Sequence, residues 1–384
     1  MSWHLQGFDS REFIQQYWQK KPCLIRQAFD GFQSPISPQE LAGLACEDDV
    51  HSRLVIESGA ETPWQLSYGP FTEDDFLSLP ETHYSLLVSE CEKWIPEFAE
   101  LLEQFHFIPS WRVDDLMVSY APEGGSVGPH CDEYDVFLLQ SYGRRKWQFS
   151  DTRVDKPRLI QGLELAIMQD FKADQEAILE PGDMLYLPPG IAHHGVALEP
   201  CMTCSIGFRA PTATEIMESF VLETDRQNLG SKRYSDSELE TDRFHAEITS
   251  VEIDHIKQMV ISSLEQPRSF WVDTAGKLLS DSVVVDVNPD QRPARFDDFF
   301  KSEWMINPDS RMLYYLSSDS LRYYCNGHCY ELPNSDLAID TLQKLCNRGN
   351  LALSTLEACR DDESLAGLLL ELANTAAIVR IDET

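Results

Sequence analysis

One stretch of this chain, residues 117–147, restricts the possible folds more than any other. It contains apolar runs separated by a Gly/Pro-rich loop at 124–129 and by a tight turn at Gly143. This pattern predicts strand, loop, strand, turn and strand, which is typical of an antiparallel sheet. His130 and Asp132 stand at its centre, two residues apart. Residues with that spacing on a strand point to the same side, so we expect the imidazole and the carboxylate to face the same space.

A His-x-Asp/Glu motif is a weak signal by itself. The chain has 384 residues with 10 His and 64 Asp or Glu, so about 1.7 such motifs are expected by chance. It contains two, and the one at 245–247 lies in a polar, charge-rich segment that we interpret as exposed surface. The motif at His130 differs because glycines and prolines lead into it and a strongly apolar strand, residues 136–139, follows it.

A second histidine is available in a later segment that is also bounded by glycine and proline turns. A Glu-Pro-Gly-Asp turn precedes an apolar strand at 184–187, and a Pro-Pro-Gly break then leads to His193. Two histidines and one carboxylate form an arrangement that leaves three metal positions open for substrate and oxygen. A lone histidine is more often a surface or core residue, but the two segments together favour a metal site made of His130, Asp132 and His193.

These segments together resemble a known family. They are similar to the JmjC-type (cupin-like) 2-oxoglutarate oxygenases, and more closely to the bacterial ribosomal oxygenases, which hydroxylate an arginine in the sixteenth large-subunit ribosomal protein. The resemblance is strong over residues 1–212 and weaker after them. It rests on the His-x-Asp motif, the Pro-Gly-Asp turn and the segments 13–22, 36–45, 111–117, 188–195 and 205–211.

The resemblance implies a fold, a domain order and a set of cofactors. The fold would be mainly β with α additions: a double-stranded β-helix, the cupin or JmjC jelly-roll barrel, at 1–212. A helical region at 213–284, through which the family forms homodimers, and a winged-helix-like domain at 285–384 would follow. Fe(II), 2-oxoglutarate and O2 would be used to hydroxylate an arginine of a large-subunit ribosomal protein, with succinate and CO2 as the other products.

Strand parity and the resemblance indicate further site residues. Asp115, Met117 and Ser119 share one face of a strand expected at 111–120. A buried Asp115 needs a cationic partner, which a substrate arginine would supply, although a carboxylate at a strand end would be exposed and need none. We expect Ser119, Arg145 and Thr203 to contact 2-oxoglutarate, and Asp115, Met117, Tyr134 and Ser205 to line the arginine pocket.

The cation for the distal carboxylate of 2-oxoglutarate is expected in a basic turn. Arginine binds a carboxylate through two parallel hydrogen bonds. Family position points to Arg145, but parity alone does not choose between Arg144 and Arg145. A solvated basic turn is the alternative.

The composition limits the possible partners. The formal net charge is −33, which disfavours nucleic acid and anionic membranes and favours a basic protein or peptide. Residues 295–384 hold 8 Lys/Arg against 15 Asp/Glu, so we expect this domain to contact protein rather than DNA. No signal peptide and no run of about 18 apolar residues is recognised, which predicts a cytoplasmic protein with reduced cysteines.

Other functions remain open from the sequence. A cupin metalloenzyme that does not use 2-oxoglutarate would need the same metal ligands but not Arg145. A scaffold or regulator would use the terminal domain and have no turnover. Within the oxygenases, hydroxylation of histidine or demethylation of lysine is an alternative to hydroxylation of arginine.

Periodicity predicts elements outside the central stretch. A helix at 9–19 capped by Asp9 is expected near the start, and a Pro-containing linker is expected at 283–295. Further expected helices are 37–45, 94–105, 212–228, 253–264, 270–279, 335–346 and 365–373, and the expected late strands are 312–316, 321–324 and 377–381.

Overall fold

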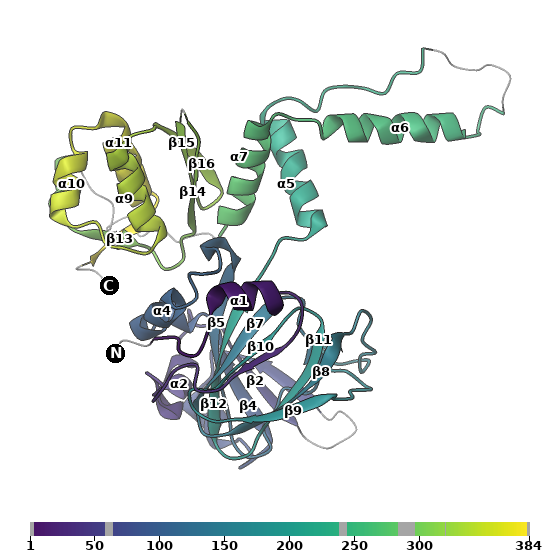
Figure 1. Cartoon of the computed structure of the whole chain (residues 1–384), viewed down its shortest axis with the longest axis vertical. Coiled ribbons are helices and arrows are strands. Elements are labelled where there is room, and N and C mark those ends of the chain that lie inside the picture. The colour runs from purple at the N-terminus through teal and green to yellow at the C-terminus, as the bar shows by residue number, and fades with distance from the viewer. Residues whose placement is uncertain (1–3, 58–63, 238–243, 283–295, 319, 382–384) are drawn as a thin grey trace. The chain divides into compact units, whose positions relative to one another are not determined.

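Two compact units, residues 1–210 and 211–384, make up the chain in this computed structural model. The structure describes residues 4–57, 64–237, 244–282, 296–318 and 320–381 (Figure 1). The expected linker at 283–295 lies outside the described residues. The finer division of the second unit at residue 284 stays a prediction. In the described part of the chain, no helix is long and apolar enough to cross a membrane.

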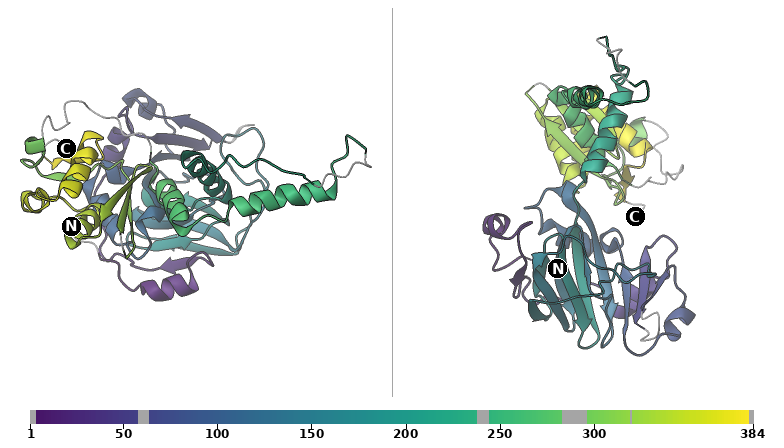
Figure 2. Two further views of the ribbon diagram at one scale, coloured as in Figure 1. Left: turned by 90° about the horizontal axis from the view of Figure 1, so that it is seen from above. Right: turned by 90° about the vertical axis from the view of Figure 1, so that its right-hand side faces the viewer.

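The first unit is built on two antiparallel sheets (Figures 1 and 2). Its strands are β1 (Cys23–Ile25), β2 (Ser52–Glu57), β3 (Trp64–Tyr68), β4 (Tyr84–Val88), β5 (Val113–Ala121), β6 (His130–Cys131), β7 (Asp135–Tyr142), β8 (Arg145–Arg153), β9 (Gln175–Leu179), β10 (Met184–Leu187), β11 (Ile191–Ala197) and β12 (Cys201–Phe208). The larger sheet has the order β1-β10-β7-β12-β5-β4-β2-β3, and the smaller one has the order β6-β11-β8-β9. Both sheets are open, and together they form the expected double-stranded β-helix.

The position of strand β7 between two cores explains why the sequence around residue 137 is continuously apolar and does not alternate between apolar and polar residues. Phe137 and Leu139 belong to the large core on the helix-covered face of the eight-stranded sheet. Val136 and Leu138 belong to a second core that also contains residues of β8 and β11 from the smaller sheet. Because both faces of the strand are buried, both parities must be apolar.

Helices cover the outer face of the eight-stranded sheet. They are α1 (Ser10–Gln16), α2 (Pro38–Leu44), α3 (Glu73–Leu77) and α4 (Pro96–Glu103), with short 3₁₀ turns at η1 (Cys91–Lys93) and η2 (Ser110–Arg112). The expected cap is confirmed, since Asp9 Oδ1 accepts 2.9 Å hydrogen bonds from the backbone N–H groups of Arg11 and Glu12. The helix ends earlier than expected, and Gln19 beyond it has a positive φ of 57°.

A buried carboxylate joins the ends of several elements of this unit. Asp135, at the start of β7, is 0% exposed. It accepts hydrogen bonds from the Tyr186 hydroxyl at 2.6 Å, Arg112 Nη2 at 2.9 Å and Gln19 Nε2 at 3.0 Å. A buried charge is tolerated only with such partners, so this network fixes where β7 begins.

The second unit contains two small antiparallel sheets and several helices. The helices are α5 (Ala213–Arg226), α6 (Ser250–Ser263), α7 (Arg268–Ser280), α8 (Phe296–Phe299), α9 (Asp336–Cys346), α10 (Leu353–Cys359) and α11 (Glu363–Asn374). The strands are β13 (Trp304–Ile306), β14 (Met312–Leu316), β15 (Ser320–Cys325), β16 (His328–Pro333) and β17 (Ile378–Arg380), paired as β13-β17 and β14-β15-β16. Neither β13 nor α10 was anticipated from the sequence, and both are short. Asn326-Gly327, a hairpin turn signal in the sequence, lies between β15 and β16.

Helix α7 is tied to the three-stranded sheet of this unit. Asp273 accepts hydrogen bonds from Arg322 Nη1 at 2.7 Å and from the Tyr324 hydroxyl at 2.8 Å. Gly276 lies against the Tyr324 ring so closely that a Cβ there would come within 2.4 Å of it. Helix α5 packs on the other side of α7, with the Phe220 and Phe270 rings 5.2 Å apart.

Candidate active site

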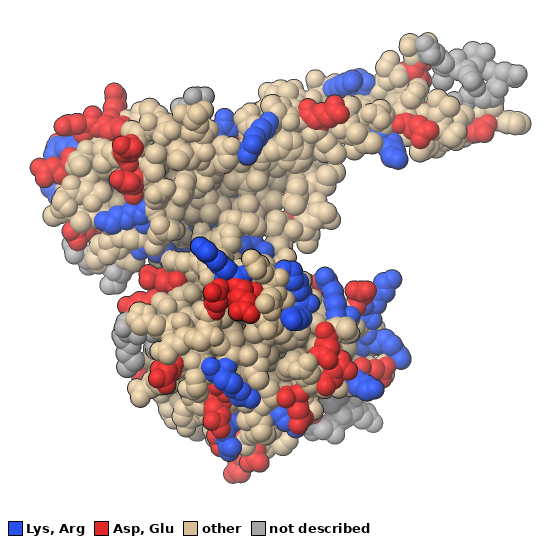
Figure 3. Space-filling view, viewed as in Figure 1, with Lys and Arg blue, Asp and Glu red and all other residues tan. Residues whose placement is uncertain are grey.

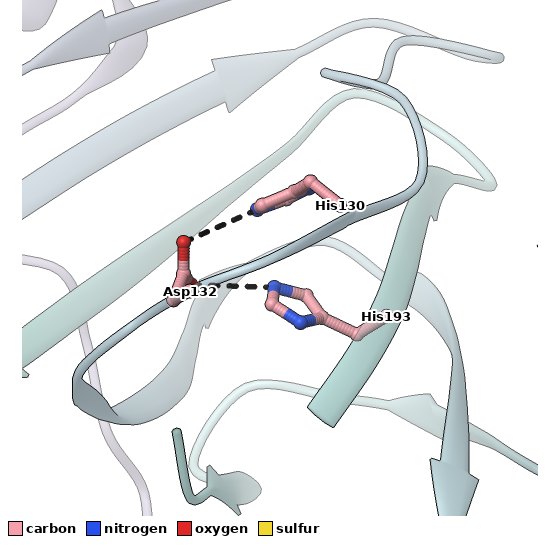
Figure 4. A group of neighbouring side chains, drawn as sticks. All are labelled: His130, Asp132 and His193. Carbon is pink, nitrogen blue, oxygen red and sulfur yellow. Dashed lines mark ion pairs between the residues drawn. The ribbon is translucent and has the colours of Figure 1, made fainter. Parts of the chain in front are cut away.

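Three side chains from two neighbouring strands converge in the first unit. His130 on β6 is paired directly with His193 on β11, and Asp132 follows β6 immediately. Asp132 Oδ1 lies 3.8 Å from His130 Nε2, and Asp132 Oδ2 lies 3.5 Å from His193 Nε2 (Figure 4). One ligand atom from each of the three residues lies within 4.8 Å of the others, which no other such group does among the residues that the structure describes.

Backbone contacts prepare both imidazoles for a metal. His130 Nδ1 lies 2.9 Å from the Gly128 carbonyl oxygen, and His193 Nδ1 lies 2.9 Å from that of Ile191. A carbonyl oxygen only accepts, so each Nδ1 carries the proton and each Nε2 presents its lone pair to the shared space. Burial and then His130 lower the pKa of His193 to about 4, which keeps this ring neutral at pH 7. The donor set and its geometry therefore fit a divalent metal ion.

The segment that presents His130 is supported from the loop between β8 and β9. The Met168 backbone N–H donates a 2.7 Å hydrogen bond to the Pro129 carbonyl oxygen. Ile167 packs directly on Gly128, where an added Cβ would come within 3.0 Å of the isoleucine side chain. Gly128 has a φ of 81°. These two contacts hold the backbone of Gly128 and Pro129 in place, and with it the Gly128 carbonyl that orients His130.

The two candidate arginines lie in different environments. Arg144 is exposed and forms two 3.1 Å hydrogen bonds with Glu199. Arg145 is 6% exposed, and its Nη1 donates to Ser119 Oγ at 3.4 Å. The Nε and Nη2 groups of Arg145 have no hydrogen-bond partner within the described residues. A buried cation with unused donors is complementary to an anion, so the interior arginine fits the distal carboxylate of 2-oxoglutarate.

Hydroxyl and amide groups form a polar row next to Arg145. Ser119 on β5 is paired with Thr203 on β12, and Thr203 is paired with Gln140 on β7. The Thr203 hydroxyl donates to Gln140 Oε1 at 3.0 Å, and Ser119 Oγ donates to the Thr203 carbonyl oxygen at 3.4 Å. All three side chains are buried. The structure thus brings the three expected cosubstrate residues together on the inner face.

The expected substrate residues fall into neighbouring positions of the same sheet. Met117 on β5 is paired with Ser205 on β12, one step along the strands from the row of Ser119. Gly207 leaves space beside Asp115, because a Cβ there would lie 3.5 Å from Asp115 Oδ1. Burial, followed by Asp132 and then Asp115, raises the pKa of the Tyr134 hydroxyl. Tyr134 therefore lies near both the metal ligand Asp132 and Asp115.

Asp115 is partly buried and lies among other charged groups. Burial, followed by the nearby Asp114, raises the pKa of the Asp115 carboxyl to about 6, while Arg53 on β2 opposes this rise. Among the described residues it accepts one hydrogen bond, from the Glu90 backbone N–H, and this bond is long at 3.4 Å. No ion pair with Asp115 occurs in the part of the chain that the structure describes. This carboxylate is therefore open to a cationic ligand.

Gln140, Trp147 and Arg53 contribute to the site but were not anticipated from the sequence. Gln140 has the same parity as Val136 and Leu138, so a polar residue at an inner position of an apolar strand was a usable signal. Arg53 is far away in sequence, and its Nη2 lies 3.6 Å from Met117 Sδ. Only the pairing of β2 with β4, and of β4 with β5, brings it there.

Comparison with known proteins agrees with this geometry. Residues 100–216 match the JmjC domain, and residues 272–378 match the ROXA-like winged helix. The chain is 35% identical over 373 residues to the ribosomal protein uL16 3-hydroxylase of Escherichia coli, which covers 95% of each sequence. The chain belongs to the JmjC-domain ribosomal oxygenases. A probable ribosomal oxygenase of Haemophilus influenzae is 33% identical, covering 94% of this chain and 92% of the relative.

Solved structures of this oxygenase family extend the comparison. The crystal structure of E. coli YcfD superposes with a TM-score of 0.85 at 33% identity, covering 99% of this chain and all of the other. A second YcfD structure, in complex with cobalt and 2-oxoglutarate, has a TM-score of 0.82 at 33% identity and covers 99% of each chain. The JmjC family uses Fe(II), 2-oxoglutarate and O2. The protein is thus a 2-oxoglutarate-dependent oxygenase, which decides against a cupin enzyme that lacks this cosubstrate and against a scaffold.

We predict that His130→Ala, Asp132→Ala and His193→Ala each weaken Mn²⁺ binding by more than about 100-fold. Loss of a ligand should exceed the roughly 10–100-fold effect of losing a group that only orients one. Isothermal titration of the metal-free protein measures this. His194→Ala is the matched control, because His194 lies beside His193 but packs on Phe171 with ring centroids 6.0 Å apart. Equal losses in the control and the ligand variants would contradict the assignment.

Proposed function

We propose that this oxygenase hydroxylates an arginine side chain of the large-subunit ribosomal protein uL16. The observation that carries the proposal is the half-buried Asp115 carboxylate, which forms no ion pair with any described cation and shares a face of β5 with Met117 and Ser119. A buried carboxylate without a partner is unfavourable, and an arginine guanidinium would provide the missing charge and two parallel hydrogen bonds. The E. coli relative is a hydroxylase of the ribosomal protein uL16.

Each group of residues has a separate task in this proposal. His130, Asp132 and His193 hold the metal, and Arg145, Ser119 and Thr203 receive the distal carboxylate of 2-oxoglutarate. When bound, iron, 2-oxoglutarate and O2 supply the oxidising chemistry that hydroxylates a C–H bond. The protein orients both substrates and excludes water from the pocket.

The substrate side chain would enter between β5 and β12. Asp115 binds its guanidinium, Ser205 offers a hydroxyl to the same group, and Met117 and Tyr134 form the apolar walls along its methylene groups. The strongly negative net charge of −33 also favours the approach of a basic ribosomal protein. Such a substrate would place the activity in the cytoplasm.

Mass spectrometry of a uL16 peptide tests this function directly. Incubated with Fe(II), 2-oxoglutarate and enzyme, the peptide should gain about 16 Da, and fragmentation should place the added oxygen on an arginine. The His130→Ala variant is the control and should leave the peptide unchanged. Oxygen on histidine, or removal of a methyl group from lysine, would support the alternatives within the oxygenases instead. Turnover of 2-oxoglutarate without a change in the peptide would refute uL16 as the substrate.

The Asp115 carboxyl should make activity pH-dependent. Its raised pKa of about 6 means that it is ionised above pH 6 and becomes neutral as the pH falls through 6. The KM for a cationic peptide should therefore rise below pH 6. We expect Asp115→Asn to lower kcat/KM by about 30-fold or more, since a buried charge partner is lost, and to remove this pH dependence.

A matched substitution controls for general effects of charge on this pH profile. Glu133→Gln removes a carboxylate near the metal ligands whose side chain is 86% exposed, so it should keep both kcat/KM and the pH profile of the wild type. Steady-state kinetics between pH 5 and 8 measure both variants. An unchanged profile in Asp115→Asn would show that another group recognises the substrate.

We propose further that the helical part of the second unit forms a homodimer. Helix α6 has no buried residue, and Ile253, Ile256 and Val260, which share one face, are 49–52% exposed. Charged side chains are widely spaced along α6, which lies at the upper right of the view (Figure 3). An amphipathic helix in water needs an apolar partner, and a second copy of α6 supplies a matching face. The terminal domain, which carries more acidic than basic residues, is proposed to contact protein rather than DNA.

The double substitution Ile256→Asp with Val260→Asp should convert the dimer to monomers. Two charges would be buried in an apolar interface without partners, which is strongly unfavourable. Gln258→Asp adds a charge to the same helix but about 100° or more away from both positions, so it should leave the dimer intact. Size-exclusion chromatography with light scattering distinguishes the species. A monomeric wild-type protein would contradict the proposal.

A further inference from the structure

Trp147 lies between the two ends of the proposed cosubstrate site. It follows Arg145 by two residues on β8, so both side chains face the inner space. The centre of its ring lies 5.7 Å from Arg145 Cζ and 5.8 Å from the centre of the His193 ring. The indole therefore lies close both to the arginine and to one of the metal ligands.

Gly195 allows the indole to take this place. Trp147 is paired with Gly195 on β11. A Cβ at Gly195 would come within 2.7 Å of the six-membered ring, a distance at which any other residue would displace the indole. The close approach keeps the ring beside His193 and fixes its orientation.

The indole N–H is a buried donor without an acceptor. Trp147 is 5% exposed, and its Nε1 has no hydrogen-bond partner among the described residues. Arg145 Nε and Nη2 share this condition. A buried donor left unpaired costs about 1–3 kcal/mol, so a native protein normally provides an acceptor. Two adjacent side chains that offer only donors require an acceptor-rich ligand, and a carboxylate is one.

We propose that the indole N–H of Trp147 donates a hydrogen bond to a carboxylate oxygen of bound 2-oxoglutarate. Arg145 neutralises the charge of the diacid, whereas Trp147 fixes its position between the arginine and the metal ligands. Trp147 is thus a cosubstrate-binding residue in addition to Arg145, Ser119 and Thr203. The inference rests on 2-oxoglutarate being the cosubstrate and on no property of the protein substrate.

Removing the N–H while keeping the aromatic ring tests this role. Trp147→Phe does so with some loss of volume, and benzothienylalanine at position 147 replaces only the N–H by sulfur. We expect 2-oxoglutarate to bind the Mn²⁺-loaded protein about 10-fold more weakly or worse in both variants, as for loss of a hydrogen bond to a charged group. Isothermal titration under anaerobic conditions measures this binding without turnover, and affinity for Mn²⁺ alone should not change.

A second tryptophan provides the control. Trp304 is also buried, but its Nε1 donates to the Phe299 carbonyl oxygen at 2.9 Å, so Trp304→Phe should lower stability without changing 2-oxoglutarate affinity. Unchanged affinity in both Trp147 variants would overturn the inference. So would a parallel loss of Mn²⁺ affinity, because packing on His193 would then explain the effect. Failure of the wild-type protein to bind 2-oxoglutarate would refute the cosubstrate itself.

Discussion

The catalytic unit depends on holding three metal-binding groups within 4.8 Å of one another. Side-chain packing alone would not orient the ring nitrogens of the two imidazoles. The protein solves this with backbone carbonyl groups, which fix the protonated Nδ1 of both histidines. The Gly190 backbone N–H also donates to the Asp132 carbonyl oxygen at 2.7 Å. Because the supports are main-chain groups, the geometry follows from the strand pairing.

Strand register places the cosubstrate residues as firmly as the metal ligands. β12 lies between β5 and β7, so that Ser119, Thr203 and Gln140 form one row, and Met117 and Ser205 begin the next. A shift of one residue would turn Ser119 toward the helices and bring Val118 into the pocket. The core on the opposite face prevents this shift, because Val118 and Cys204 are 0% exposed within it. Apolar packing on one face therefore maintains polar chemistry on the other.

The sequence predicted those parts of the site that local spacing determines. His130 and Asp132 are two residues apart, and turn residues precede His193. The three metal-binding residues could therefore be predicted without a structure. The choice between Arg144 and Arg145 was not, because it depends on which face of β8 meets the second sheet. Arg53 and Trp147 were missed for a related reason. Their positions arise from strand pairing across long sequence separations. In a strand, an isolated arginine is most often an exposed residue and an isolated tryptophan a packing residue.

The second unit shows the same contrast between local and distant information. The apolar stripe of α6 was visible as a helical period, but only the structure shows that nothing in the described part of its own chain buries it. Helix α7 has a similar stripe, but it packs on β15. Asp273 accepts hydrogen bonds from Arg322 and Tyr324 of that strand, and Gly276 lies against the Tyr324 ring. Two adjacent helices with similar sequence patterns thus differ in their partners. The one anchored by the half-buried Asp273 packs on the three-stranded sheet β14-β15-β16, and the one without such an anchor leaves its apolar face exposed within the described part of the chain.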